Sequence, residues 1–464
     1  MIFCNCLNKF HWNLQDFYAG DIFGDKYFKN SNGFTIFENF KHLHMILLKN
    51  IVVNGRISDM LIRDGHIASI SPCTDSADIE ASDAEVVECE GKTALPGFVN
   101  MHTHAGMSLM RGIGEDIAFH EWLKRIWEIE VKVDAEYVYH ATKVACLEMI
   151  KTGTTTFNDQ YWYMPMAYKA AQEMGIRSAL SYVICDRNDP AESERQKEQC
   201  ISMYEASRSW NDMAVFTLAI HAIYSVSEPM ILWATEFARE RGLKIHIHVS
   251  ETKKEVDDCL ALHGCSPVEY LDRLGVLGPD VIAAHTLWLS PEDVAILGRR
   301  GVTCVHNVNS NLKLSSGYRF LYNELRDAGA NVCLGTDGCG SSNNLDMLET
   351  MKTSAMIQKA WREDASAMPL AELMDMATVN AGKGLGLNIG RLEEGALADV
   401  LIVDTNNYNF LSPGSFEANL IYSAHSDCIE SVICNGRFVM RNRIVEGEKD
   451  ILEQAKAVLN RLTC

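Results

Sequence analysis

Histidine and acidic side chains stand at the ends of several short apolar runs of this sequence, where their types could bind a metal ion. They are His102 and His104, His246 and His248, Glu251, His285, His306 and Asp337. Neutral imidazole and carboxylate groups suit Zn²⁺ or Fe²⁺, with one coordination position left for water. One buried histidine at a strand end is more often structural, but such residues at the ends of several strands favour a metal site.

The spacing within two of these runs decides which side chains can converge. His102 and His104 are two residues apart, so in a strand both imidazoles point to the same side. His246 and His248 also share a side and lie about 7 Å apart along a strand, so they compete for one ligand position. We choose His248, because it lies nearer the strand end and three residues before Glu251. We expect His246 to fill a deeper layer.

The elements that must position these side chains are eight short apolar runs that alternate with helical segments. The runs are Gly97–Met101, Thr154–Asn158, Arg177–Val183, Val215–Ile220, Lys244–His248, Val281–Ala284, Val302–Val305 and Val332–Leu334. Eight strand–helix alternations within residues 95–387 predict an α/β fold, a (β/α)8 TIM-like barrel, with an open doubly wound sheet as the alternative. Active-site residues of such barrels lie at the C-terminal ends of the strands, where the histidines and Asp337 fall.

The two segments that flank the barrel carry short strands and turns of their own. Residues 45–94 contain turns at Asn54-Gly55 and Asp64-Gly65, and residues 388–464 contain one at Asn435-Gly436. We expect the two segments to form one small β-sandwich domain together. A helix is expected at the C-terminal end of the second segment.

Residues 1–44 differ from the rest of the chain. They are rich in aromatic residues, show no periodic pattern, and have no basic start followed by an apolar run, so they do not look like a secretory signal. At Met45 a strand-like apolar run begins, which suggests that Met45 is the natural start and that the extension is not native. We therefore expect a chain that starts at Met45 to fold, keep its metal and turn over substrate as well as the full chain.

The composition is that of an ordinary soluble globular protein with an acidic balance. Of 464 residues 47% are hydrophobic and 22% charged, and 42 Lys and Arg stand against 62 Asp and Glu, a net charge of −20. This balance argues against nucleic acid and anionic membranes as partners, and no apolar run is long enough for a transmembrane helix. The 15 cysteines are interpreted as reduced thiols of a cytoplasmic protein. Association into a homo-oligomer stays open.

Five segments together resemble the amidohydrolase superfamily and, within it, the methylthioadenosine/S-adenosylhomocysteine deaminase branch. They are Leu95–His104, Thr152–Asp159, His248–Thr252, Ser310–Leu314 and Leu334–Gly338. The resemblance covers residues 45–464. It implies one divalent metal ion, with zinc favoured over iron, held by His102, His104, His248 and Asp337. It also matches Glu251 and His285 to the proton-transfer residues of the family.

The resemblance implies a hydrolytic deaminase that converts the adenine of a 5′-modified adenosine to hypoxanthine and releases ammonia. The candidate small-molecule substrates are methylthioadenosine, S-adenosylhomocysteine, 5′-deoxyadenosine and adenosine. A metal lowers the pKa of its bound water towards ~7. Asp337 and His285 then take the water's proton and orient the attack, and a protonated Glu251 donates to a ring nitrogen. The carboxylated lysine that bridges two metals elsewhere in the superfamily has no candidate after the fourth run, where His221 stands, so one metal is favoured.

Contacts to the nucleoside are also implied by the resemblance. Glu130 would accept hydrogen bonds from the ribose hydroxyls, although on sequence alone a solvated helix charge is the simpler interpretation. His221 resembles a nucleoside-contacting histidine of the family. Arginines after the third run would hold an amino-acid tail, and here only Arg187 or Arg195 is near. We therefore expect less polar 5′-substituents to be preferred.

Two other functions are weighed against this one. Another single-metal reaction, such as guanine deamination or triazine dechlorination, is the first, and Glu130 discriminates because only a nucleoside needs a ribose acceptor. A non-catalytic barrel scaffold is the second. The complete set of site residues argues against it, because scaffolds of this kind usually lose ligands.

Overall fold

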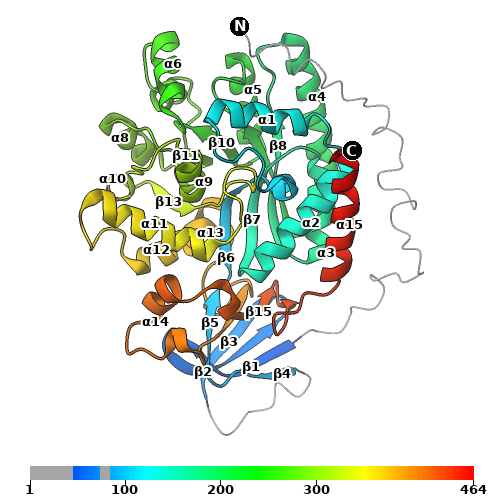
Figure 1. Cartoon of the computed structure of the whole chain (residues 1–464), viewed down its shortest axis with the longest axis vertical. Helices are drawn as coiled ribbons and strands as arrows, with labels where there is room; N and C mark the ends of the chain where they lie inside the picture. Colours follow the sequence, from blue (N-terminus) through cyan, green and yellow to red (C-terminus); the bar gives the residue numbers. More distant parts are fainter. Residues whose placement is uncertain (1–44, 74–83, 464) are drawn as a thin grey trace.

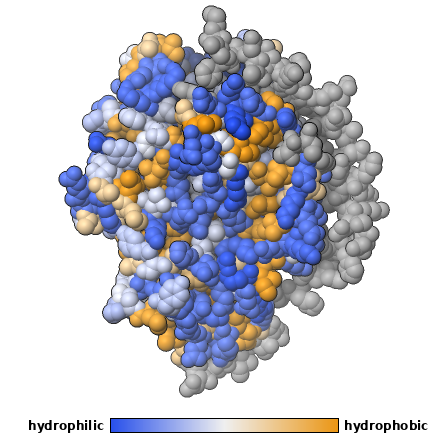
Figure 2. Space-filling model, viewed as in Figure 1, coloured by the Kyte–Doolittle hydropathy of each residue, from blue (hydrophilic) through white to orange (hydrophobic). Residues whose placement is uncertain are grey.

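The computed structural model describes residues 45–73 and 84–463. The expectation for residues 1–44 therefore lies outside the described residues. Figure 1 shows a large barrel surrounded by helices and a smaller sheet at one end of it. Hydrophilic residues predominate over the middle of the surface seen in the same view, with hydrophobic residues between them (Figure 2). Within the two described ranges, no helix is long and apolar enough to cross a membrane.

Eight parallel strands form the barrel, in the order in which they occur along the chain. They are β6 (Phe98–Thr103), β7 (Thr154–Gln160), β8 (Arg177–Ile184), β9 (Ala214–Ile220), β10 (Ile245–Val249), β11 (Val281–His285), β12 (Thr303–His306) and β13 (Asn331–Leu334). The first and last strands meet where the backbone N–H of Asp337 donates to the carbonyl of His102 (2.9 Å). The side chain of Asn100 joins them again by accepting from the N–H of Thr336 (3.0 Å). The predicted barrel fold is confirmed.

Burial on both faces explains why these strands could be recognised. Every residue of β7, β10 and β11 is buried, as expected for parallel strands that have a packed barrel interior on one side and helices on the other. Such strands give unbroken apolar runs in a sequence, interrupted only by the polar residues that face the barrel interior or its mouth. Each of the eight predicted runs overlaps one barrel strand.

Helices surround the barrel and cover its mouth. In chain order they are η2 (Ala105–Met110), α1 (Phe119–Glu130), α2 (Ala135–Lys151), α3 (Met164–Met174), α4 (Pro190–Ser207), α5 (Glu228–Glu240), α6 (Lys253–His263), α7 (Pro267–Arg273), α8 (Pro291–Arg300), α9 (Val308–Lys313), α10 (Tyr322–Asp327), α11 (Met347–Arg362), α12 (Leu370–Ala377) and α13 (Val379–Leu385). Local signals start several of them. Ser266 and Ser290 each form a capping box with the third helical residue and precede a proline at the first.

The smaller sheet combines both flanking segments, with β16-β15-β14-β5-β1-β2-β3 in order and β4 beside β1. Its strands are β1 (Met45–Val53), β2 (Arg56–Arg63), β3 (His66–Pro72), β4 (Glu85–Glu88), β5 (Lys92–Pro96), β14 (Val400–Asp404), β15 (Ile429–Cys434) and β16 (Arg437–Met440). The sheet curls, because the N–H of Ile67 bonds the carbonyl of Ala396 just before β14 (2.9 Å). It thereby encloses an apolar core of its own. Between β14 and β15 lie the short helices η3 (Tyr408–Phe410), α14 (Phe416–Ala418), η4 (Asn419–Ser423) and η5 (Ser426–Cys428), and α15 (Glu448–Thr463) ends the chain.

A buried ion pair joins the barrel to this sheet. Arg177, at the start of β8, is 1% exposed, and its Nε lies 3.3 Å from a carboxylate oxygen of Asp399. The other oxygen of Asp399 accepts the N–H of Asn435 in the turn between β15 and β16 (2.7 Å). One carboxylate therefore links the bottom of the barrel to a hairpin of the sheet.

We expect Arg177→Met to lower the free energy of unfolding by about 3–5 kcal/mol, because it leaves the charge of Asp399 buried and unpaired. Urea unfolding followed by fluorescence would measure the loss. Arg208→Met is the matched control, because Arg208 pairs with Glu205 at the surface with 70% and 57% of the side chains exposed. The control should lose at most about 1 kcal/mol. Equal losses in the two variants would contradict a special role for the buried pair.

Candidate metal centre and active site

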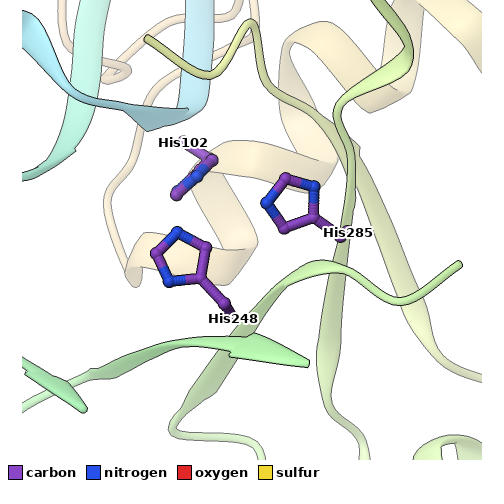
Figure 3. Close-up of side chains that lie close together, drawn as sticks. All are labelled: His102, His248 and His285. Carbon is purple, nitrogen blue, oxygen red and sulfur yellow. The ribbon is translucent and has the colours of Figure 1, made fainter. Parts of the chain in front are cut away.

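The histidines at the strand ends converge at the mouth of the barrel. The ring centroid of His102 on β6 lies 4.9 Å from that of His248 on β10 and 5.4 Å from that of His285 on β11. Figure 3 shows these three rings turned toward one shared space. His104 lies beside them, with its ring centroid 4.8 Å from that of His102. The loop after β13 adds Asp337 on the same side.

Two overlapping groups of potential ligand atoms result, and within each group all the atoms lie within 4.8 Å of one another. One contains His102, His248 and His285, and the other contains His102, His104 and Asp337. The carboxylate Oδ1 of Asp337 lies 3.4 Å from Nε2 of His102 and 3.2 Å from Nε2 of His104. The predicted ligands therefore come together, and distance alone leaves His285 as an additional candidate.

The local sequence around Asp337 explains how its carboxylate is aimed. The N–H of Gly338 donates to Oδ1 (2.8 Å), and the hydroxyl of Ser310 on α9 donates to Oδ2 (2.6 Å). A side chain at Gly338 would put its Cβ 2.9 Å from the Cβ of His104, and one at Gly335 would approach the backbone of His102 equally closely. The two glycines that flank Thr336 and Asp337 thus let the loop come close to β6.

The second ring nitrogen of each histidine shows which nitrogen is free for a metal. Nδ1 of His104 faces the carbonyl of Gln160 (2.6 Å), and Nδ1 of His248 faces the carbonyl of His221 (2.8 Å). A carbonyl only accepts, so both Nδ1 atoms carry the proton and both Nε2 atoms keep a lone pair. Nε2 of His102 is buried without a hydrogen-bond partner. This donor set fits a divalent metal ion.

Electrostatics support the same conclusion. Burial lowers the pKa of His102 to about 4 and that of His248 well below its ordinary value, so both rings are neutral and can act as ligands. Burial also acts on His104, but Asp337 outweighs it and raises the pKa of His104 to about 9. A proton on Nε2 of His104 and a metal ion would therefore compete for the same place beside Asp337, and a bound metal would take the Nε2 lone pair in place of that proton.

His246 occupies the deeper layer that its position on β10 predicted. It is fully buried, and its Nε2 lies 2.9 Å from Nδ1 of His102. Its Nδ1 lies 3.2 Å from the amide nitrogen of Asn158 on β7. His246 therefore supports the ring of His102 from below and does not reach the shared space.

Glu251 and His285 lie next to each other beside the ligand cluster. Their closest atoms, Oε2 and Nε2, are 3.8 Å apart. Burial and the charge of Asp337 raise the pKa of Glu251 to about 8, so its carboxyl group is protonated at neutral pH. This is the state that a proton donor needs.

Glu255, which was not predicted as a site residue, holds the turn that carries Glu251. Its carboxylate accepts the backbone N–H groups of Ser250 and Glu251, both at 2.9 Å. Ser250 has a left-handed backbone (φ +53°), which these bonds stabilise. The available signal was Thr252 followed three residues later by Glu255, a capping-box pattern at the start of α6.

The candidate substrate contacts separate into two groups. Glu130 ends α1 and is only 8% exposed, on the same helix face as the buried Trp122 and Ile126. Burial raises its pKa to about 7, against the opposing effects of the Tyr161 hydroxyl and the charges of His104 and Arg187. The solvated-charge interpretation of Glu130 is therefore wrong.

His221 and Arg187 act on this site, and Arg195 is paired with a neighbour on its own helix. The ring of His221 lies 5.1 Å from that of His248, and its Nδ1 contacts the hydroxyl of Ser225 (2.7 Å). The charge of Arg187 acts on both Glu130 and His221. Arg195 lies on α4, where its Nε donates to Glu192 one helical turn earlier (2.8 Å). Of the two candidate arginines, Arg187 therefore acts on the site residues, whereas Arg195 is paired within its own helix.

Comparison with known proteins gives relatives that span most of the chain. The model of the amidohydrolase family matches residues 93–439. A 5′-deoxyadenosine deaminase of Methanoregula boonei is 43% identical over 379 residues, 81% of this chain and 86% of the relative. A 5-methylthioadenosine/S-adenosylhomocysteine deaminase of Thermococcus sibiricus is 39% identical over 398 residues, 85% of this chain and 94% of the relative.

The fold comparison agrees. A crystal structure of an adenosine deaminase from Xanthomonas campestris with bound zinc superposes with a TM-score of 0.84 and 28% identity, over 90% of this chain and 98% of that one. The matched family model covers both the strand-end histidines and Asp337. From the barrel, its metal-ligand set and these relatives we conclude that the chain belongs to the amidohydrolase family.

Proposed function

We propose that the protein is a hydrolytic deaminase that converts the adenine ring of a 5′-modified adenosine to hypoxanthine with release of ammonia. The observation that carries the proposal is the largely buried carboxyl group of Glu251, which lies 3.8 Å from His285 and beside a metal-ligand cluster. The relatives named as 5′-deoxyadenosine and methylthioadenosine/S-adenosylhomocysteine deaminases support the choice of substrate class. Free cysteines among the described residues suit a cytoplasmic location.

The site holds a single divalent metal ion, and we propose zinc, which the neighbouring adenosine deaminase structure contains. The proposed ligands are His102, His104, His248 and Asp337. When bound, the metal supplies a water molecule activated near neutral pH. Elemental analysis of the purified protein would distinguish zinc from iron.

The remaining chemistry belongs to side chains of the chain. Asp337 accepts the proton of the attacking water, and His285 orients the attack on C6 of adenine. Glu251 donates its proton to a ring nitrogen, so that C6 becomes tetrahedral without a negative charge building on the ring. Each proton transfer by a placed group contributes on the order of 10²–10⁴ in rate. The amino group takes the proton held by Asp337 and leaves as ammonia, and the proton of the new C6 hydroxyl returns to Glu251 as the carbonyl of hypoxanthine forms.

The candidate nucleoside contacts offer few charges to hold a polar 5′-substituent. Glu130 would accept the ribose hydroxyls, and His221 would contact the nucleoside. Of the two candidate arginines, Arg187 is the one whose charge acts on Glu130. We therefore propose that methylthioadenosine and 5′-deoxyadenosine are preferred to S-adenosylhomocysteine.

Ammonia release from a substrate panel tests this function. The panel contains adenosine, 5′-deoxyadenosine, methylthioadenosine, S-adenosylhomocysteine, adenine and guanine, each compared by kcat/KM. We expect the two 5′-substituted adenosines without an amino-acid tail to rank highest. Highest activity on guanine would replace the proposal by guanine deamination.

Glu130→Ala should raise KM for nucleosides much more than for free adenine, because only nucleosides have hydroxyls to lose. A lost pair of hydrogen bonds to a charged acceptor corresponds to about 10-fold or more in KM. Steady-state kinetics on methylthioadenosine and adenine would measure the difference. The matched control is Glu128→Ala on the same helix, where 59% of the side chain is exposed. Equal effects on both substrates would assign Glu130 a structural role.

A further inference from the structure

The segment Ser310–Leu314 resembles a family motif, and its Asn311 has no assigned role. Asn311 lies in α9, directly after β12, and is 1% exposed. Its amide nitrogen Nδ2 lies 3.0 Å from Nδ1 of His285 and 3.1 Å from the hydroxyl of Ser316. A buried side-chain amide thus contacts His285, the histidine for which distances alone do not decide between metal ligand and proton-transfer residue.

The orientation of the Asn311 amide follows from its neighbours. The hydroxyl of Ser316 donates to the backbone carbonyl of Asn311 (3.5 Å), so it is left to accept from Nδ2. Asn307 is the other amide near His285. In the orientation that satisfies both its ends, it donates to the carbonyl of Gly335 (3.2 Å) and accepts the backbone N–H of His285 (3.3 Å), and its Oδ1 then stands 3.3 Å from Nδ1 of that ring. Asn311 is the nearer of the two amides, and with its Nδ2 toward the ring it is the donor to Nδ1 of His285 (3.0 Å).

A donor at Nδ1 decides where His285 carries its proton. An amide nitrogen only donates, so Nδ1 must present its lone pair, and the single proton of a neutral imidazole then lies on Nε2. This is the reverse of His104 and His248, whose Nδ1 atoms face carbonyl groups. His285 therefore points an N–H, and not a lone pair, into the shared space.

We propose that Asn311 is a positioning residue that holds His285 as an Nε2–H hydrogen-bond donor toward the reacting oxygen. This excludes His285 from the metal ligands and selects His102, His104, His248 and Asp337. It also narrows the role expected from the sequence, because a ring protonated at Nε2 orients the attacking oxygen by donation while Asp337 takes the proton. The inference rests on the proposed deaminase function.

The decisive variant is Asn311→Asp, which keeps the shape of the side chain but replaces the donor with an acceptor. The carboxylate favours the proton on Nδ1 of His285 and removes it from Nε2. In the Ser-His-Asp triad of hydrolases, fixing the catalytic imidazole in the wrong tautomer lowers kcat by up to ~10⁴-fold. We expect kcat to fall by at least about 100-fold while KM changes by less than about threefold.

Two further variants separate positioning from folding. Asn311→Gln keeps the amide and should recover part of the rate. Asn309→Ala is the control on the same helix, because Asn309 bonds the exposed Glu349 (3.3 Å) and should leave kcat unchanged. Metal content and melting temperature are measured for each variant, so that a misfolded protein is recognised.

Nitrogen-15 NMR of histidine-labelled, zinc-loaded protein reads the tautomer directly, with His285→Gln used to assign the signal. We expect the proton on Nε2 in the wild type and on Nδ1 in Asn311→Asp. A wild-type proton on Nδ1, or full kcat in Asn311→Asp, would overturn the inference. Absence of deamination in the wild type would instead overturn the proposed function, and the NMR result would still decide the tautomer.

Discussion

Asp337→Ala and His102→Ala are each expected to empty the metal site and stop turnover. Asp337 is the only carboxylate in the proposed ligand set, and its Oδ1 lies within 3.4 Å of Nε2 of both His102 and His104. Without it the three neutral imidazoles have no negative charge to balance a divalent cation. Loss of the metal removes several kcal/mol of transition-state stabilisation, so kcat should fall by about 10³-fold or more.

Elemental analysis after gel filtration measures the metal, with ammonia release measured on the same samples. Asp327→Ala is the control, because the Asp327 side chain is 67% exposed and away from the ligand cluster. About one metal ion per chain in Asp337→Ala would contradict the ligand assignment. If His285→Ala lost the metal in the same experiment, the alternative group of His102, His248 and His285 would hold it.

The fold was predictable because burial leaves a direct mark on the sequence. Strands such as β10 and β11 are buried on both faces, so their residues form short apolar runs that end in the polar groups of the barrel mouth. The pairing of the first segment with the last was predictable only from turn residues. The antiparallel pairing of β5 with β14, in which Leu95 lies opposite Leu401, joins the two segments. Neither segment alone carries a pattern that predicts this pairing.

The ligand cluster was predictable because its residues are the strand ends themselves. Supporting residues were harder to find, since they lie on neighbouring elements and their partners depend on the packed structure. Glu255 gave only a capping signal, and its bond to the N–H of Glu251 depends on the left-handed Ser250. Asn311 belongs to a family-like motif, but its contact with His285 could not be predicted, because the two residues stand at the ends of neighbouring strands.

The sequence carried a pattern that distinguishes Arg187 from Arg195 as a candidate substrate contact. Glu192 and Arg195 are three residues apart in a segment that starts with a proline and forms a helix, a spacing that pairs opposite charges on one face. Arg187 lies before that helix, in a loop with a left-handed backbone (φ +53°). The spacing therefore predicted an ion pair between Arg195 and Glu192. The place of Arg187 could not be predicted, because it depends on the conformation of the loop.

Glu251→Gln should keep the metal and lose about 10²–10⁴ in kcat, because an amide cannot donate a proton and take it back. Burial raises the pKa of Glu251 to about 8, so the acid form dominates at neutral pH, and wild-type activity should fall as pH rises through that value. The residual rate of the variant should lack this alkaline limb. Glu292→Gln is the control, with 59% of that side chain exposed. Wild-type turnover in Glu251→Gln, or an unchanged alkaline limb, would show that another group donates the proton to the adenine ring.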